Sequence, residues 1–368
     1  MTFDPIYIHG MNCVTPLGMD LLSNWTQLLM GNGGIIRHDV GRIKNSYVAK
    51  FISEEAAGLL TPVQDSTLLE RMLFTAAKPI ASKYVLTPRT ALVLSTTKGN
   101  VSLLQDGRMA DAQLNVLANK MAEALGFQTQ PIVVSHACVS GLLALSVAKR
   151  LIQIGQYDDA VVLAGDVVSE FVVSGFQAFQ AMSPFPCKPF DKDRAGVSLG
   201  EAAACVYVSK EKGEFKILGE AAINDANHIS GPSRTGEGLV QSVLRAGREA
   251  SIDIKDIDFI SAHGTATLYN DEMEAVAFHR LGLQDVPIHS LKGYYGHTLG
   301  ASGLLETVIA LKAMQEEVLL PTLGFEELGV SQPVNIIREA GYRPLTRLLK
   351  TASGFGGSNA AMLVERCG

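Results

Sequence analysis

The sequence predicts an α/β protein whose helices cover a mostly parallel sheet. Short buried runs rich in β-branched residues alternate along the chain with longer apolar runs at helical spacing. The second half of the chain repeats this order in outline, and no linker-like segment separates the halves. Runs of βα units imply parallel pairing of the strands. Because the order of elements repeats, we expect one body formed by duplication, with an N-terminal half at 1–209 and a C-terminal half at 210–368.

The first half opens with a strand, a turn and a helix. Residues 6–9 have the pattern of a short strand, and residues 21–30 have helical spacing that ends at a glycine cluster. From 35 to 63 the pattern weakens, so we expect loops with short elements there. The other elements expected in this half are helices at 68–84, 113–125 and 142–151, and strands at 91–95, 132–134, 160–164 and 202–209.

The second half is expected to alternate in the same way. The expected strands lie at 215–222, 258–262, 288–290 and 360–365, and the expected helices at 238–250, 271–281 and 301–314. The closing strand follows a glycine-rich turn, so we expect the chain to end in the sheet.

Composition limits the class of protein. The 368 residues are 47% hydrophobic and 18% charged, so the chain can bury a large core. No window reaches about 18 uninterrupted apolar residues, so no membrane span is expected. Asp4 and the lack of a basic residue before the first apolar run argue against a secretory signal. We therefore expect a soluble globular protein of the cytoplasm.

Charge and cysteine usage exclude further classes. A net charge of −6 and the absence of arginine-rich or lysine-rich runs give no general electrostatic reason to bind nucleic acid. The five cysteines are odd in number, widely spaced and without a CxxC pair, which argues against a disulfide framework and a zinc ribbon. Reduced thiols are expected, and an acidic partner must meet a local basic patch.

Cys138 is the first candidate for chemistry. It lies in a turn of small residues between the strand at 132–134 and the helix at 142–151. A thiol at a helix N-terminus is close to unsatisfied N–H groups and the positive end of the helix dipole, which favour the thiolate. Cys138 is therefore either a nucleophile or a small hydrophobe packed between strand and helix.

Two histidines occupy comparable turns. His263 directly follows the strand that ends at residue 262, and His297 precedes the helix expected from residue 301. Strand ends and helix starts meet on the side of a parallel sheet where α/β proteins hold ligands, so Cys138, His263 and His297 can form one site. Taken singly, each histidine is an ordinary structural group, and the three residues together could instead bind a metal. No HExxH or other close ligand spacing supports the metal.

The residues around the histidines favour thioester chemistry. Thr265 and Thr267 offer two hydroxyls at alternate positions, which point the same way in an extended segment and suit a polar chain lying along it. The glycine-rich segment 354–359 allows close backbone approach and could supply an N–H group to an oxyanion.

Six segments in order carry a resemblance over nearly the whole chain. They read GMNCVTPLG, ACVSGLLAL, CKPFDKDRAGVSLGE, DIDFISAHGTAT, HTLGASGLLE and GFGGSNA. With them the chain resembles the β-ketoacyl-acyl carrier protein synthases, specifically the elongating type with a Cys-His-His triad. The resemblance implies the thiolase-like fold, in which two duplicated βαβ-type halves form a layered α-β-α-β-α body.

The resemblance implies a role for each residue of the triad. Cys138 attacks an acyl thioester and holds the acyl chain, and His263 and His297 stabilise the loss of carbon dioxide from malonyl-acyl carrier protein. The resulting carbanion attacks the acyl group and gives a 3-oxoacyl product. Two imidazoles that donate to a thioester oxygen stabilise an enolate, as this chemistry needs. The family uses no metal and no organic cofactor, since phosphopantetheine on the carrier protein carries the substrates.

Five further site residues follow from the resemblance. The backbone N–H groups of Cys138 and Phe355 would form the oxyanion hole, and Phe355 would also gate the acyl pocket. Thr265 and Thr267 would bind the phosphopantetheine arm. Lys292 and Glu306 match a polar pair beside the second histidine, and they would help to orient that histidine without contacting the substrate. Core packing for the phenylalanine and an ordinary ion pair are the structural alternatives.

Several positions depart from the family pattern. They are Gly293, Tyr294, Tyr295, Leu268, Ala195 and Ala202. The stretch between Gly34 and Cys138 is also shorter than in fatty-acid elongation enzymes. These departures favour, as the alternative, a specialised ketosynthase of aryl polyene or flexirubin-type biosynthesis, or a subunit of a heterodimer that resembles a chain-length factor.

Rival classes make different demands on the sequence. Chain-length factors lack the nucleophilic cysteine, and initiating synthases have asparagine in place of the second histidine, whereas this chain has Cys138 and His297. A thiolase would use a second cysteine late in the chain, and Cys367 lies outside any suitable turn. The triad thus favours a catalytic elongating synthase.

Partners are expected from the same resemblance. An acidic acyl carrier protein needs a basic face, to which Arg71, Arg245 and Arg248 on predicted helices could contribute. The family forms homodimers, and a heterodimer with a related synthase is the alternative. A hydrophobic strand such as 160–164 would suit a sheet that continues across the dimer.

Overall fold

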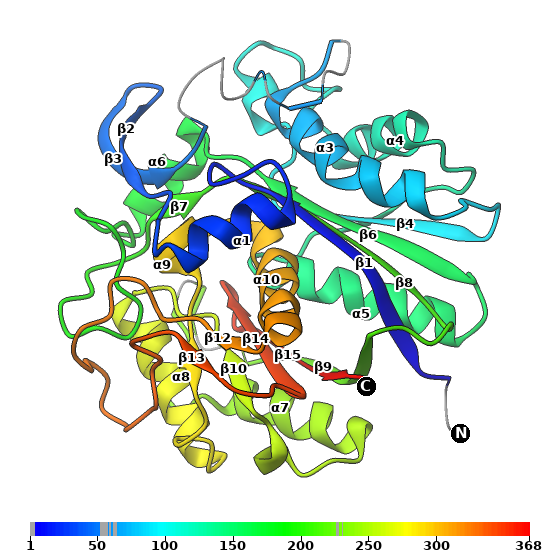
Figure 1. The fold of residues 1–368 in the computed structure, drawn as a ribbon. Helices are drawn as coiled ribbons and strands as arrows, with labels where there is room; N and C mark the ends of the chain where they lie inside the picture. Colours follow the sequence, from blue (N-terminus) through cyan, green and yellow to red (C-terminus); the bar gives the residue numbers. More distant parts are fainter. Residues whose placement is uncertain (1–3, 52–57, 59, 62–64, 226–227, 230) are drawn as a thin grey trace.

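The computed structural model describes residues 4–51, 58, 60–61, 65–225, 228–229 and 231–368 (Figure 1). Among these residues, ten strands form one sheet in the order β11-β10-β14-β15-β9-β1-β8-β6-β4-β5. The strands of the first half are β1 (Ile6–Val14), β4 (Thr90–Ser95), β5 (Ile132–Val134), β6 (Asp159–Asp166) and β8 (Ala202–Ser209). Those of the second half are β9 (Phe215–Asn224), β10 (Phe259–Ser261), β11 (Ile288–His289), β14 (Arg347–Gly354) and β15 (Ser358–Arg366).

The two halves have the same strand order. Counted outward from the centre of the sheet, each half places its first, fifth, fourth, second and third strand in turn. The halves join where β1 pairs with β9, Ile6 opposite Ile217. The expected duplication is therefore visible as topology, although the sequences of the halves do not repeat.

The prediction of a mostly parallel sheet is wrong. The outer pairings β4–β5, β4–β6, β10–β11 and β10–β14 are parallel, but the five central pairings from β6 to β14 are antiparallel. Only one of these five pairs, β14–β15, is a hairpin closed by a short turn. The other four join strands that are distant in the chain, so their direction depends on long-range pairing and not on a local βα pattern.

Helices lie in three layers around the sheet (Figure 1). The outer helices of the first half are α3 (Leu68–Lys83) and α4 (Leu114–Leu125), and those of the second half are α7 (Glu237–Ala250) and α8 (Leu268–Arg280). Between the half-sheets lie α5 (Ser140–Gln153) and α10 (Ser302–Glu316). Separate apolar cores fill the middle layer and the two outer interfaces, which gives the expected α-β-α-β-α body.

Glycines bring the N-termini of the two central helices together. A Cβ on Gly141 would lie 2.7 Å from the backbone nitrogen of Leu304, and a Cβ on Gly303 would lie 2.7 Å from that of Leu142. Such distances leave no room for a side chain, so glycine at both positions is a condition of the close packing. Because the turns before these helices carry Cys138 and His297, this contact brings the two side chains together.

Other elements extend or revise the predictions. Strand β1 continues to Val14 instead of turning after residue 9, because Gly10 packs against Tyr84 and the buried Asn12 donates to the carbonyl of Ala76 at 3.1 Å. Helix α1 (Leu21–Leu29) lies where expected. Helix α6 (Glu170–Ala178) and strand β14 were not predicted. No helix of the described ranges is long and apolar enough to cross a membrane.

Short elements complete the description. Strands β2 (Ile36–Val40), β3 (Ile43–Ala49) and β7 (Leu199–Gly200) form a small sheet, and β12 (Val318–Leu319) pairs with β13 (Gly341–Tyr342). Helix α9 (Lys292–Tyr295) is a single turn. The short elements expected from 35 to 63 are thus found as β2 and β3, and most of 52–64 lies outside the described residues.

The strand at 160–164 cannot continue the sheet into a second subunit. As part of β6 it lies inside the sheet, paired with β4 on one side and β8 on the other. Strand β5 stands at the end of the strand order, paired with β4, and its three residues are half-buried. The free edge of the first half therefore belongs to β5, the strand that leads to Cys138.

Candidate active site

Cys138 occupies a strained turn between β5 and α5. Ala137, immediately before it, has a φ of +45°, a left-handed conformation that few residues other than glycine adopt. The end of β14 comes very close: a Cβ on Gly354 would lie 3.1 Å from the backbone nitrogen of Cys138. Glycine at this position lets the next residue, Phe355, donate its backbone N–H to the Cys138 thiol.

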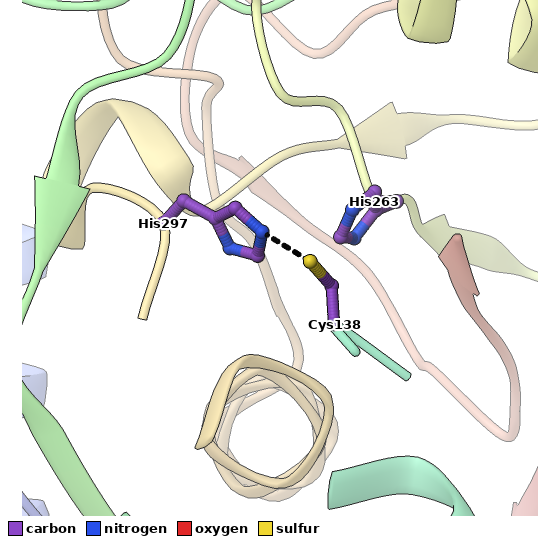
Figure 2. Close-up of side chains that lie close together, drawn as sticks. All are labelled: Cys138, His263 and His297. Carbon is purple, nitrogen blue, oxygen red and sulfur yellow. Dashed lines mark hydrogen bonds between the residues drawn. The ribbon is translucent and has the colours of Figure 1, made fainter. Parts of the chain in front are cut away.

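His297 contacts the thiol directly. Its Nε2 lies 2.9 Å from Cys138 Sγ, and its Nδ1 lies 2.9 Å from the hydroxyl of Ser302 in the first turn of α10 (Figure 2). The backbone of His297 is fixed too, since its N–H donates to the carbonyl of Ser198 at 2.7 Å. Because a serine hydroxyl can donate or accept, the Ser302 contact allows either tautomer of the ring.

His263, in the loop that follows β10, lies close to the same thiol and to the ring of His297. The centroids of the two imidazole rings lie 5.2 Å apart and the rings are nearly perpendicular. Lys292 Nζ lies 3.2 Å from His263 Nδ1 and donates to the His263 carbonyl at 2.6 Å. An ammonium group has no acceptor, so Nδ1 must accept and the proton of the neutral ring is on Nε2. His263 is therefore set as a hydrogen-bond donor toward the site.

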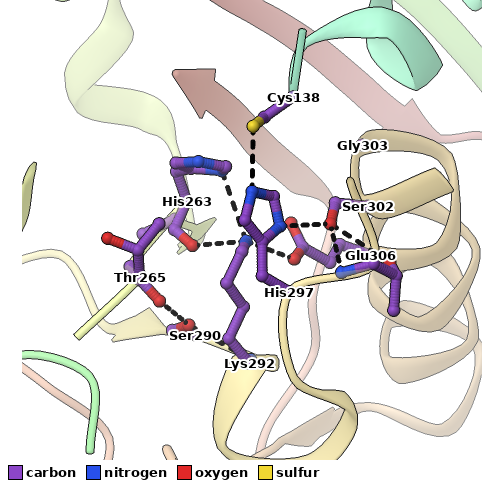
Figure 3. A network of polar contacts seen from close by, with 12 residues as sticks. Cys138, His263, Thr265, Ser290, Lys292, His297, Ser302, Gly303 and Glu306 are labelled. Carbon is purple, nitrogen blue, oxygen red and sulfur yellow. Dashed lines mark hydrogen bonds and ion pairs between the residues drawn. The ribbon is translucent and has the colours of Figure 1, made fainter. Parts of the chain in front are cut away.

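A buried ion network lies behind His263 (Figure 3). Lys292 Nζ pairs with Glu306 Oε1 at 2.6 Å, and Lys350 Nζ pairs with Glu306 Oε2 at 2.8 Å. Both ammonium groups are fully buried. The Lys292–Glu306 pair was expected to support the second histidine. The hydrogen bonds of Lys292 go instead to the first, to the ring Nδ1 and the carbonyl of His263.

Acidic side chains hold the loop that follows β10. Glu274 on α8 accepts the backbone N–H of His263 at 2.8 Å and that of Gly264 at 2.6 Å. Asp271 accepts the N–H groups of Thr265 and Ala266. Burial, with the charge of Asp271 adding to it, raises the pKa of Glu274 to about 7.

Burial dominates the protonation of the triad. It raises the pKa of the Cys138 thiol to about 11, although Lys292 and Lys98 act in the opposite direction. Burial, followed by the charge of Lys292, lowers the pKa values of His263 and His297 well below their usual range. The helix N-terminus was expected to favour a thiolate, and burial acts in the opposite direction because it makes the charged form costly. The resting pair is a neutral thiol and a neutral imidazole.

The raised thiol pKa gives a testable pH dependence. Alkylation of Cys138 by iodoacetamide is expected to accelerate about tenfold per pH unit from about pH 7 to about pH 10, since the thiolate fraction rises that steeply below a pKa near 11. The rate is measured by intact mass and peptide mapping. A rate that levels off near pH 7 would contradict it and would show a thiolate stabilised by the helix N-terminus.

The three residues of the triad line a cavity of about 380 Å³. Both threonine candidates line it, and their hydroxyls are 2.9 Å apart. The backbone between them is a tight turn with Ala266 at a φ of +64°, so the segment is not extended as predicted. Thr267 also caps α8, where its side chain accepts the N–H of Asn270. The two hydroxyls nevertheless lie side by side, on residues that line the cavity.

Aromatic side chains form the other wall of the cavity. The ring of Phe355 lies 5.6 Å from that of Phe176 and 5.4 Å from that of Phe179, both from the unpredicted α6 region. All three rings line the cavity that holds Cys138. Phe355 is therefore not plain core packing, because its ring borders the cavity and its N–H contacts the thiol.

The triad also has the donor set of a metal site. The thiol sulfur and one nitrogen from each histidine all lie within 4.8 Å of one another, as zinc ligands can. The charges nearby oppose a dication, however. Lys292 Nζ already occupies the hydrogen-bonding position at His263 Nδ1, and two ammonium groups share the single Glu306 carboxylate. The arrangement therefore suits the handling of a developing negative charge better than the binding of a cation.

Sequence analysis missed several residues of the site. Ser302, Glu274, Lys350, Phe176 and Phe179 all contact the triad, its supporting groups or the cavity wall. Ser302 and Lys350 had a signal, a serine at a helix start and a lysine inside an apolar run. The three arginines proposed for a basic face do not form one patch, because Arg71 is on α3 and Arg245 and Arg248 are on α7, in opposite outer layers (Figure 1).

The fold and the site together define an acyl-transferring enzyme of the thiolase-like class. Residues 80–213 match the beta-ketoacyl synthase N-terminal domain, and residues 215–326 match the beta-ketoacyl synthase C-terminal domain. The chain belongs to the β-ketoacyl synthase family of condensing enzymes.

Relatives and solved structures agree with this family. The chain is 24% identical to 3-oxoacyl-acyl-carrier-protein synthase 2 of Vibrio cholerae, over 98% of this chain and 99% of the relative. It is 32% identical to the tetracenomycin polyketide synthase ketoacyl synthase alpha subunit of Streptomyces glaucescens, over 68% of this chain and 63% of that one. Its fold is similar to a structure of the ketosynthase ApeO with its chain length factor ApeC from Xenorhabdus doucetiae (TM-score 0.90, 24% identity, 99% of this chain and 98% of that one).

Proposed function

We propose that the protein is a β-ketoacyl-acyl carrier protein synthase that elongates an acyl chain by decarboxylative Claisen condensation. The observation that carries the proposal is the 2.9 Å contact between Cys138 Sγ and His297 Nε2 on the wall of the cavity. The His263 ring lies beside them, with its proton on Nε2. Cys138, His263 and His297 are the catalytic residues in this proposal.

The first half-reaction transfers the acyl group to Cys138. His297 Nε2 takes the thiol proton as sulfur attacks the acyl thioester, and the N–H groups of Cys138 and Phe355 stabilise the oxyanion. The tetrahedral intermediate collapses to acyl-Cys138 and releases the phosphopantetheine thiolate, which takes the proton from His297. A thiol with a pKa raised by burial needs this base, because little thiolate is present at neutral pH.

The second half-reaction forms the carbon–carbon bond. The malonyl thioester loses carbon dioxide, and the Nε2–H of His263 holds the enolate oxygen that results. His297 adds a second donor when its ring is in the tautomer with the proton on Nε2, which its contact with the Ser302 hydroxyl also allows. The enolate carbon attacks the acyl-Cys138 carbonyl, and collapse of the second oxyanion gives the 3-oxoacyl thioester and releases the Cys138 thiolate, which takes one proton from solvent. The Thr265 and Thr267 hydroxyls, on the cavity wall, would hold the phosphopantetheine arm.

The proposal includes the partners and the place of the reaction. The substrates arrive on an acyl carrier protein in the cytoplasm, and the enzyme works without a metal or organic cofactor. The half-buried edge strand β5 suits a dimer in which the sheet continues into a second subunit, either a homodimer or a heterodimer with a related synthase. Similar solved structures include ketosynthases with their chain length factors, which supports testing both arrangements.

Two classes of acyl substrate are compatible with the proposed reaction. A saturated chain would assign the enzyme to fatty-acid elongation, and a conjugated chain would assign it to polyene or polyketide synthesis. The aromatic wall of Phe176, Phe179 and Phe355 offers stacking to a flat conjugated group.

Intact-mass analysis tests the proposal. The protein is incubated in EDTA with acyl-carrier proteins that differ in chain length and unsaturation, and we expect one acyl adduct on the wild type and none on Cys138→Ala. Cys367→Ala, which removes a thiol outside the cavity, is the matched control and should retain the adduct. Absence of an adduct with every donor would refute an independent enzyme and favour a subunit that acts within a heterodimer.

A further inference from the structure

We propose that Lys350 is a positioning residue for decarboxylation, holding the backbone that carries His263 and maintaining a positive charge behind its ring. The inference rests on the proposed function and adds a residue to it. Lys350 lies in the middle of β14, and its ammonium group is fully buried. Because a buried charge is costly unless it is paired, a lysine at this position of the strand points to a function for its ammonium group.

The contacts of Lys350 tie it to the His263 backbone. Its Nζ donates to the carbonyl of Ser261 at 3.0 Å and to that of Thr351 at 2.6 Å, and it pairs with Glu306 Oε2 at 2.8 Å. Lys292 makes the equivalent connection from the other oxygen of Glu306 to the His263 carbonyl. One carboxylate thus anchors two lysines that hold β10 at its last residue and at His263.

The charges around His263 do not cancel. Lys292 on α9 and Lys350 on β14 carry two positive charges, and Glu306 on α10 carries one negative charge. The net charge of this ion network is therefore positive. Glu274 on α8 accepts the His263 backbone N–H, and burial raises its pKa toward neutrality. The neighbouring ring of His297 is neutral. This net charge keeps His263 neutral and favours the negative charge of the enolate.

The first half-reaction uses different groups. His297 and the Phe355 N–H contact the Cys138 thiol, and the bonds of Lys350 go to Glu306 and the backbone of β10 and β14. Removing Lys350 should therefore slow decarboxylation without slowing the acylation of Cys138. A purely structural lysine would change both rates together.

The experiment compares the two half-reactions in full-length protein. Acylation of Cys138 is followed by intact mass with an acyl-carrier protein that labels the wild type, and decarboxylation by conversion of malonyl- to acetyl-carrier protein. For Lys350→Met we expect decarboxylation to fall about 30-fold and acylation to stay within about twofold. Loss of the nearby cation raises the pKa of His263, so the acidic limb of the decarboxylation profile should move to higher pH. Lys350→Arg should retain most of the rate.

Lys149→Met is the matched control. Lys149 is also a buried lysine in an ion pair, 2.5 Å from Glu249, but it lies in α5 away from the triad, so both rates should match the wild type. If the methionine variant does not fold, Lys350→Gln replaces it in the same comparison. Equal losses in both half-reactions, or an unchanged decarboxylation rate and pH profile, would overturn the role of Lys350. A wild type that takes no acyl group would instead refute the proposed function.

Discussion

Replacing His263 with alanine is expected to reduce decarboxylation of malonyl-carrier protein about 10³-fold and to leave acylation of Cys138 within a few-fold of wild type. The reason is the fixed tautomer: Lys292 occupies Nδ1, so the Nε2–H of His263 is the donor available to the enolate oxygen. His297, not His263, is within hydrogen-bond distance of the thiol. Single-turnover acylation by intact mass and carbon dioxide release measure the two steps separately.

His297→Ala provides the complementary control. It removes the base that contacts Cys138 Sγ, so acylation itself should slow, whereas His263→Ala should still form the acyl-enzyme. A His263 variant that loses acylation as strongly as decarboxylation would contradict this division of labour between the two rings. Circular dichroism of each variant separates loss of fold from loss of chemistry.

The residues of the triad were predictable because each is in a turn that the sequence marks clearly. Cys138 follows a β-branched strand and precedes a long apolar helix, and both histidines lie at strand ends or helix starts. Such local patterns identify candidates, and the family resemblance implies their roles. The close approach of α5 and α10 depends on Gly141 and Gly303, which no local pattern connects to each other.

The errors have long-range physical causes. Antiparallel pairing in the middle of the sheet includes one short hairpin, β14–β15, and pairs between distant strands such as β1 and β9, whose paired residues are about 200 positions apart. Strand β14 was missed because Lys350, Thr351 and Ser353 interrupt its apolar pattern. Their polar groups are satisfied by Glu306, Glu274 and Asn359, which lie elsewhere in the chain. The effect of burial on the thiol pKa could not be predicted, because a helix N-terminus can be recognised from a turn, whereas burial depends on the whole fold.

Replacing Glu306 with glutamine is expected to destabilise the protein by about 3–5 kcal/mol. Glu306 is buried, and Lys292 and Lys350 each pair with one of its oxygens. Although burial acts to raise the pKa of Glu306, the two lysines hold it below its usual value, so the carboxylate stabilises the fold at neutral pH and this contribution is lost only under acidic conditions. Glutamine leaves two ammonium groups close together with no negative charge between them. Urea unfolding at pH 7 measures the loss.

The double variant Glu306→Gln/Lys350→Met distinguishes charge from packing. If the loss comes from uncompensated positive charge, removing one lysine should recover part of the stability, and the two effects will not add. If Glu306 acts only by filling space, the second substitution will add its own cost. We expect stability to recover and decarboxylation not to recover. The double variant removes the repulsion between the two lysines, but it also removes Lys350, one of the groups that hold the backbone next to His263.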